Sequence, residues 1–362
     1  MIIDIVGRFF GRVRPCATQC PFTTEDRCPR SGPLSWLEGK LLKVRLNASN
    51  PSRFIGKKKG RTRLQMERRT DRCSGPWDPD ASSTWGVHLM SEQRRSVNDE
   101  LRYLGRAASI LATHPREGLE RLRGRMAILV DDSLRRASRA AKYEPVSDWL
   151  PRLHRGVHVE WPCAVVREFE EAWTEMVASL SARGLPGGRG HDADRALAQA
   201  IWCVTRHLGP ERVVETGVAR GVTSAFVLLA LERNESGHLW SIDLPPVMPV
   251  WHSQSAVAVP ESLKRRWTYV RGSSRRRLPQ LLDRLGAIDL FVHDSLHTEE
   301  NMRFEMKAAW SKIRPGGVLV ADDVDSNRGF GAFGSSVAGA ESMVVRHSEK
   351  GGLFGVIVKA VE

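Results

Sequence analysis

This 362-residue chain has little cysteine outside its first quarter and no long apolar run. Only Cys163 and Cys203 lie beyond residue 89. Two isolated cysteines do not build a disulfide framework, so a reducing cytoplasm is the expected location. No uncharged stretch approaches the roughly 20 apolar residues that cross a bilayer, so no membrane association is expected. An acid, Asp4, lies near the start of the sequence, where a secretory signal would be basic, and the first apolar run is too short for such a signal.

The formal net charge of +13 is concentrated at one end of the chain. Residues 1–89 carry 17 Lys/Arg against 8 Asp/Glu, whereas the other 273 residues carry 38 against 34. The basicity is therefore not a nucleic-acid face spread over the rest of the protein. A small-molecule substrate is the expected partner, nucleic acid is not, and the sequence leaves self-association into a homo-oligomer open.

Residues 1–89 lack helical or strand periodicity and are rich in Pro, Ser, Arg and Gly, which predicts a basic extension of low structure. Three interpretations stay open for it: a zinc site, a basic tail for an acidic partner, or a dispensable and even non-native extension. The zinc site would use Cys16, Cys20, Cys28 and Cys73, whose spacings do not match the paired short spacing of zinc modules. The third interpretation is favoured because a patterned helical segment opens at Met90, where translation could begin.

Residues 90–190 are predicted to form a helical segment. Leu101, Leu104, Ala108 and Leu111 share one face at helical spacing, and a second stripe runs through residues 163–183. Such stripes are typical of a core or of a cover over a neighbouring domain, so the segment is expected to cover the substrate. The sequence Gly-Leu-Pro-Gly-Gly-Arg-Gly at 184–190 marks the boundary with the next part of the chain.

From residue 191 the pattern alternates between helix and strand. Strands are predicted over 211–216, 238–243, 267–271, 288–293 and 316–321, and helices over 193–207, 222–233, 259–265, 275–285 and 298–313. This alternation predicts a doubly wound, mostly parallel α/β sheet. Two further strands, 342–347 and 353–359, are separated only by a short turn and predict an antiparallel hairpin at the edge of a seven-stranded sheet.

The strand predicted over 211–216 runs into a glycine turn, framed by Gly217 and Gly221. Glycine there permits positive φ and close backbone approach, and the next helix offers free N–H groups to an anion. Hydroxyls at Thr223 and Ser224 flank that helix end. Asp243 closes the second strand, where a carboxylate can hold ribose hydroxyls. The turn lacks the middle glycine of a dinucleotide fingerprint, and its acid, Glu215, suits a ligand carrying an ammonium group rather than a pyrophosphate.

More acids follow the fourth and fifth predicted strands, at Asp294 and at the pair Asp322 and Asp323. Because neighbouring parallel strands lie about 5 Å apart, these carboxylates are expected to meet and to share one Mg²⁺ ion. Such an ion would lower the pKa of a substrate hydroxyl. His297, three residues after Asp294, is placed to accept the proton. Each residue taken alone has an ordinary structural explanation, and it is their joint occurrence that favours a site.

These motifs resemble the class I S-adenosylmethionine-dependent methyltransferases over about residues 191–362, including the terminal hairpin. The resemblance implies that Glu215, Gly217 and Gly221 line the methionine half of the cofactor and that Asp243 holds its ribose. Ser273 and Ser274 match the segment that borders the adenine, although this chain lacks the acid often found there.

The chemical site is similar to that of metal-dependent O-methyltransferases, including the sugar O-methyltransferases of macrolide biosynthesis. Asp294 and Asp322-Asp323 match the family acids, with Asp in place of Asn, and Asp294-x-x-His297 matches a family motif in which His is the proposed base. The resemblance implies O-methylation of a small hydroxylated molecule such as a sugar or glycosylated metabolite. An NAD oxidoreductase, a nucleic-acid methyltransferase and a non-catalytic binding module stay open, although the glycine spacing, the charge distribution and the absence of an Asn/Asp-Pro-Pro-Tyr/Phe motif after the fourth strand disfavour the first two.

Overall fold

The computed structural model describes residues 97–137, 143–184, 193–247 and 254–361. They all belong to one unit, Ser82–Glu362. The predictions for residues 1–89, including the zinc alternative and the start at Met90, lie outside the described residues.

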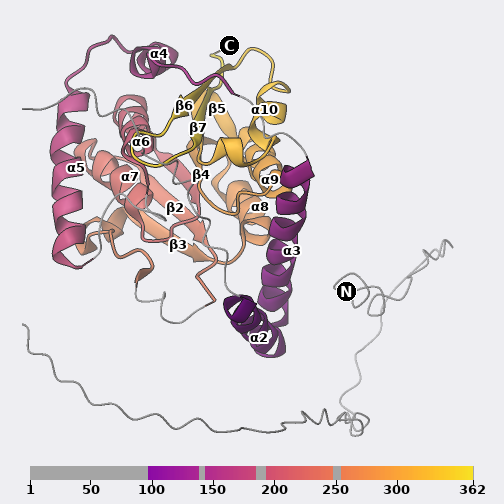
Figure 1. Ribbon diagram of the computed structural model, residues 1–362. Helices are drawn as coiled ribbons and strands as arrows, with labels where there is room; N and C mark the ends of the chain where they lie inside the picture. The colour runs from indigo at the N-terminus through magenta and orange to yellow at the C-terminus, as the bar shows by residue number, and fades with distance from the viewer. Residues whose placement is uncertain (1–96, 138–142, 185–192, 248–253, 362) are drawn as a thin grey trace, which may run out of the picture. The chain divides into compact units, whose positions relative to one another are not determined.

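A seven-stranded sheet forms the centre of this unit (Figure 1). Its strands are β1 (Arg212–Thr216), β2 (His238–Asp243), β3 (Trp267–Arg271), β4 (Ile288–His293), β5 (Ile313–Ala321), β6 (Glu341–Arg346) and β7 (Leu353–Val358). Their order is β3-β2-β1-β4-β5-β7-β6, and only β7 runs antiparallel to its neighbours β5 and β6. This confirms the doubly wound sheet with a terminal hairpin, which is the class I methyltransferase fold.

Helices cover both faces of the sheet, as Figure 1 shows. One layer contains α5 (Val165–Ala182), α6 (Arg195–Leu208) and α7 (Val222–Arg233), and the other contains α8 (Ser274–Leu285), α9 (Glu299–Trp310) and α10 (Gly329–Gly334). Alternate strand residues enter the two layers: Val213 joins the first and Val214 the second, as strand geometry requires. None of the described helices is both long enough and apolar enough to span a membrane.

The predicted helical segment before residue 184 contains α2 (Val97–Thr113), α3 (Pro115–Ala137), α4 (Trp149–Gly156) and α5. The stripe on α5 is confirmed, since Phe169, Met176 and Leu180 are buried against α6 and α7. The apolar stripe predicted on α2 does not form a buried face, so this prediction is wrong. Leu104 and Leu111 are exposed and Ala107 is buried, because α2 pairs with α3 as a helical hairpin rather than lying flat on the sheet.

The structure differs from the predictions in one helix type, two short helices and one helix end. The helix predicted over 259–265 is a 3₁₀ helix, η2 (Glu261–Arg266), and the short helices α4 and α10 were not predicted. The helix predicted over 298–313 ends at Trp310, and Ile313 instead begins β5 because it pairs with Ile288 of β4. The N-terminus of α9 is as predicted: Thr298 Oγ1 accepts a hydrogen bond from the Asn301 backbone N–H at 3.4 Å.

Candidate active site

The glycine turn after β1 lies against the segment that follows β4. Gly217 has φ 86° and Gly221 has φ 81°, conformations that favour glycine. A Cβ atom on Gly217 would lie 1.8 Å from the Asp294 carbonyl oxygen, so a larger residue would push the two segments apart. The predicted cofactor turn therefore lies directly beside the predicted chemical site. Gly221 approaches Ala256 in the same manner, at 3.1 Å from a built Cβ to its Cα.

Glu215 is fully buried beneath this turn. Its Oε2 accepts hydrogen bonds from the hydroxyls of Ser224 and Ser241, both at 2.6 Å, whereas Oε1 has no partner. Burial raises the pKa of Glu215 to about 8, and the nearby charges of Asp294 and Asp243 add to the rise while the two serines oppose it. A buried carboxyl oxygen without a partner could accept a hydrogen bond from a cationic group of a ligand.

The two hydroxyls predicted at the start of α7 are directed toward acids. Thr223 Oγ1 donates to Asp294 Oδ2 at 3.3 Å, and Ser224 donates to Glu215. Gly221, at the N-cap, offers no side chain, so the first N–H groups of α7 have no side-chain cap. An anionic ligand group would thus meet the backbone of this helix rather than the Ser224 hydroxyl.

Asp243 ends β2 at the same edge of the sheet as Glu215 and is half-buried. Tyr269 donates a hydrogen bond to its Oδ2 at 2.9 Å. Burial raises the pKa of Asp243, while this hydrogen bond and those from the backbone N–H groups of Val218 and Leu244 oppose the rise. Tyr269 was not predicted as a site residue, because nothing in the β3 sequence marks a partner across strands.

Of the two serines expected near the adenine, Ser273 fits better. Its buried Oγ has no partner. Ser274 instead hydrogen-bonds Glu305, which also binds His293 Nδ1 at 2.6 Å. His293 is fully buried, and its Nε2 has no partner.

Asp294, His297 and Asp323 lie together after β4 and β5. His297 Nδ1 is 3.0 Å from Asp323 Oδ2, and its Nε2 is 3.8 Å from Asp294 Oδ1. Burial alone would lower the pKa of His297, but the hydrogen bond to Asp323 and the surrounding carboxylates raise it to about 9. Burial and the charge of Asp322 raise the pKa of Asp294 to about 7.

Asp322 already has two cationic partners that the sequence did not indicate. Lys350 Nζ donates to its Oδ2 at 2.8 Å, and His347 Nε2 lies 2.9 Å from its Oδ1. Burial would raise the pKa of Asp322, but these two partners hold it well below the usual range. Burial disfavours charge on His347 too, yet the carboxylates of Asp194 and Asp322 on either side raise its pKa to about 9.

Asp194, the N-cap of α6, fixes the turn that carries Lys350. Its carboxylate accepts hydrogen bonds from the backbone N–H groups of Ser348, Glu349 and Lys350 at 2.7–3.1 Å. It also lies 3.4 Å from His347 Nδ1. The hairpin between β6 and β7 is thereby held over the carboxyl end of β5.

Helix α3 lies beside the segments that follow the carboxyl ends of β2 and β4. Arg121 Nη2 donates to the Pro245 carbonyl at 2.8 Å, just beyond Asp243. Further along α3, the position of Gly124 lies 3.5 Å from Leu296, measured from a built Cβ, and Asp131 accepts a hydrogen bond from the Glu299 N–H at 2.7 Å. By contrast, α5 packs in the layer of α6 and α7, so α3 is the helix beside the site.

The donor groups fit the ligands that the sequence predicts. For S-adenosylmethionine, the partnerless Glu215 oxygen could serve as an acceptor, the uncapped N-terminus of α7 as a donor, and Asp243 as an acceptor for ribose hydroxyls. For Mg²⁺, the carboxylates of Asp294, Asp322 and Asp323 are ligands of the right kind. Lys350 would have to move, because its ammonium group lies against Asp322 and 3.8 Å from Asp323 Oδ1.

This chain is similar to known proteins over part of its length. Residues 214–324 match the family described as a methyltransferase domain. Curated protein sequences give no match. Solved structures with a similar fold include the O-methyltransferase TomG from Streptomyces achromogenes, involved in tomaymycin synthesis and solved with S-adenosylmethionine (18% identity, 52% of this chain and 90% of that chain, TM-score 0.41). Another is an O-methyltransferase from Bacillus cereus solved with S-adenosylhomocysteine (17% identity, 57% of this chain and 96% of that chain, TM-score 0.40).

Proposed function

Because this chain carries a methyltransferase domain with the class I fold, we propose that it transfers a methyl group from S-adenosylmethionine to a hydroxyl of a small molecule, such as a sugar or a glycosylated metabolite. The observation that supports this most is the contact between Gly217 and the Asp294 carbonyl. It supports the proposal because the glycine turn lies beside a cluster of acids and a histidine, where an acceptor hydroxyl could meet the methyl group of a cofactor bound at the turn. The free thiols Cys163 and Cys203 agree with the expected cytoplasmic location.

The cofactor-binding role is assigned to the residues around β1, β2 and α8. Glu215 Oε1 would accept from the ammonium group of the methionine half, and the first N–H groups of α7 would bind its carboxylate. Asp243 would hold the ribose hydroxyls. Gly217, Gly221, Thr223 and Ser224 shape this pocket, while Ser273 and Ser274 border the adenine.

Asp294, Asp322 and Asp323 would hold Mg²⁺. When bound, such an ion lowers the pKa of an acceptor hydroxyl and fixes its direction. Thr223 and His297 keep Asp294 and Asp323 oriented, and the hairpin turn fixed by Asp194 keeps Lys350 near the same carboxylates.

His297 would remove the proton. In the transfer step the acceptor oxygen forms a bond to the methyl carbon while the bond between that carbon and sulfur breaks. The electron pair of the broken bond stays on sulfur, which leaves S-adenosylhomocysteine, and the hydroxyl proton passes to His297. The chain's contribution is alignment of the two reactants and a site for the proton.

The proposal is tested by calorimetry of the full chain with S-adenosylhomocysteine. We expect saturable binding at one site, weakened at least tenfold in Glu215→Gln and unchanged in Glu211→Gln, an exposed acid at the other end of β1. Absence of binding by the folded wild-type protein would rule out the methyltransferase function. Nicotinamide dinucleotide binding in the same experiment would instead favour an oxidoreductase.

The metal is tested separately, by methyl transfer to a panel of hydroxylated acceptors with added Mg²⁺ or excess EDTA. We expect EDTA and Asp322→Ala to abolish transfer while binding of S-adenosylhomocysteine persists. Full activity in excess EDTA would remove the metal from the proposal and leave the cofactor assignment intact.

A further inference from the structure

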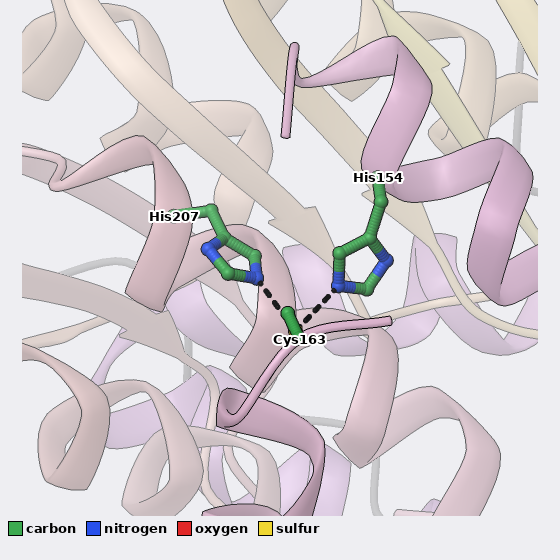
Figure 2. A group of neighbouring side chains, drawn as sticks. All are labelled: His154, Cys163 and His207. Atoms are coloured by element: carbon green, nitrogen blue, oxygen red, sulfur yellow. Dashed lines mark hydrogen bonds between the residues drawn. The ribbon is translucent and has the colours of Figure 1, made fainter. Parts of the chain in front are cut away.

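Two imidazoles and one thiol converge at a place that the methyl-transfer site does not use. Figure 2 shows His154 and His207 directed at Cys163, each through its Nε2. The distances to Cys163 Sγ are 3.0 Å from His154 and 3.3 Å from His207. The three come from α4, from the segment before α5, and from the last turn of α6. Their spacing in the sequence matches no short metal-binding motif, so only the fold brings them together.

At least one imidazole of this cluster presents a lone pair to the thiol. His154 Nδ1 lies 2.7 Å from the Leu150 carbonyl, which can only accept, so that ring carries its hydrogen on Nδ1 and presents a lone pair at Nε2. Burial lowers the pKa of His154, and burial together with the neighbouring His154 lowers the pKa of His207 to about 4. Two neutral imidazoles thus face one thiol, which has a single hydrogen to donate.

The C-terminal ends of two helices also meet at this point. His154 lies in the last turn of α4 and His207 in the last turn of α6, so the negative ends of two helix dipoles meet there. The contact between His154 Nδ1 and a backbone carbonyl is the outer hydrogen bond that commonly orients a metal-binding histidine. His154 is fully buried, and Cys163 is half-buried.

We propose that His154 Nε2, Cys163 Sγ and His207 Nε2 bind one Zn²⁺ ion, with the fourth position taken by water. Imidazole nitrogen and thiolate sulfur are the ligands that zinc prefers. Zinc bonds of about 2.0–2.3 Å at tetrahedral angles separate ligand atoms by roughly 3.3–3.8 Å. The cluster, whose ligand atoms all lie within 4.8 Å of one another, needs only small side-chain shifts to reach that geometry. Binding releases the thiol proton and leaves the thiolate on the metal.

This zinc site is distinct from the proposed magnesium site. Asp194, at the N-terminus of α6, contacts the magnesium side of the protein through His347, whereas His207 lies at the C-terminal end of the same 14-residue helix. At 1.5 Å per residue the two ends are roughly 20 Å apart. The zinc ion would tie α4 to α6, and α4 is itself tied to β6 by the ion pair between Arg152 and Glu341 at 3.1 Å. Its role is thus to hold the segment before α5 on the sheet.

The test uses the full chain with Cys16, Cys20, Cys28 and Cys73 replaced by serine, which removes the other thiols able to bind metal outside the described residues. Co²⁺ titration of this parent protein should give one equivalent with a thiolate-to-cobalt charge-transfer band, a signal that carboxylate sites cannot produce. The band should disappear in Cys163→Ser. In His154→Gln and in His207→Gln the apparent affinity for Co²⁺ should fall at least tenfold. It should persist in Cys203→Ala and in His114→Gln, the matched cysteine and histidine controls.

A second readout is thermal unfolding with and without Zn²⁺. The melting temperature of the parent should rise by a few degrees, roughly 3 °C or more, and that of His207→Gln should not respond. Absence of the cobalt band in the folded parent overturns the proposal, whatever the variants do. So does a band that survives both histidine substitutions. Rapid alkylation of Cys163 at neutral pH that Zn²⁺ does not slow would identify a reactive thiol instead of a metal site.

Discussion

At the scale of single residues, the charge balance around Asp322 and Asp323 governs the proposed chemistry. Asp322 faces Lys350 and His347, and Asp323 faces His297. The pKa values of His297 and His347 are both raised to about 9, so both rings carry charge at neutral pH. A base has to lose that proton before it can act, which makes the proposed role of His297 dependent on pH.

We therefore expect the kcat/KM of methyl transfer to rise with pH through the pKa of His297, which bound Mg²⁺ would lower from the value of about 9 that the free carboxylates give it. Asp323→Asn removes the carboxylate that most stabilises the imidazolium, so the pKa of His297 should fall and the rising limb should move to lower pH, by on the order of one unit. Both profiles are measured at saturating Mg²⁺. The pH at which the rate rises can be compared even if Asp323→Asn lowers the maximal rate. A limb that stays in place in Asp323→Asn would show that another group sets it.

The direct test of the base is His297→Ala. We expect kcat to fall by about 10²–10⁴, as for a lost general base, with the Kd of S-adenosylhomocysteine unchanged. The exposed His114 provides the control, and His114→Ala should be silent. An unchanged kcat in His297→Ala would assign proton removal elsewhere.

Lys350 leads to a separate prediction, because its ammonium group and a metal ion compete for the same carboxylates. Lys350→Met removes the charge 2.8 Å from Asp322 Oδ2, so the Mg²⁺ concentration for half-maximal activity should fall about tenfold, equivalent to ~1.4 kcal/mol. Lys307→Met, on the exposed side of α9, should not change it. If Lys350→Met instead abolishes an activity that EDTA does not affect, Lys350 itself supplies the positive charge and no metal takes part.

At the scale of elements, the sequence predicts the strands better than the contacts that the turn residues make. Apolar runs ending in Asp243, Asp294 or Asp322 place the strands and the edge where their acids meet, because neighbouring parallel strands end together. The β6–β7 hairpin was predicted too, but its turn brings Lys350 to Asp322 through Asp194, which is more than 100 residues away. No local pattern encodes such a contact. The cluster of His154, Cys163 and His207 was missed for the same reason.

The helix α3 is the element proposed to cover the substrate. Arg121→Ala would remove its buried hydrogen bond to the Pro245 carbonyl, a charged bond that contributes on the order of 1.5–3 kcal/mol. We expect KM for the acceptor to rise about tenfold with a smaller change in kcat, since the cover loosens while the reacting groups stay in place. The exposed Arg123 lies two residues along the same helix, and Arg123→Ala should be neutral. If KM and kcat both stay at wild-type values in folded Arg121→Ala, α3 is a structural layer and not a cover.

At the scale of the whole molecule, the proposed functions and the net charge belong to different parts of the chain. The residues proposed to bind cofactor, magnesium and zinc lie between His154 and Asp323, within the unit Ser82–Glu362. The excess of basic residues lies instead in 1–89, where the sequence shows no periodicity that would bury a face. An attraction to nucleic acid, if measured, is thus expected to come from residues 1–89 and not from the rest of the chain.

Removal of residues 1–89 should accordingly separate the two properties. We expect the 90–362 fragment to bind S-adenosylhomocysteine and to transfer methyl groups with a kcat/KM within about twofold of the full chain, because every proposed site residue is retained. Binding of the full chain to an RNA of random sequence should weaken steeply with salt and disappear in the fragment, since contacts to phosphates release counterions. Strong, salt-dependent RNA binding by the fragment would favour a nucleic-acid methyltransferase over a small-molecule enzyme. Loss of methyl transfer by a folded fragment that still binds S-adenosylhomocysteine would instead show that residues 1–89 help to build the acceptor site.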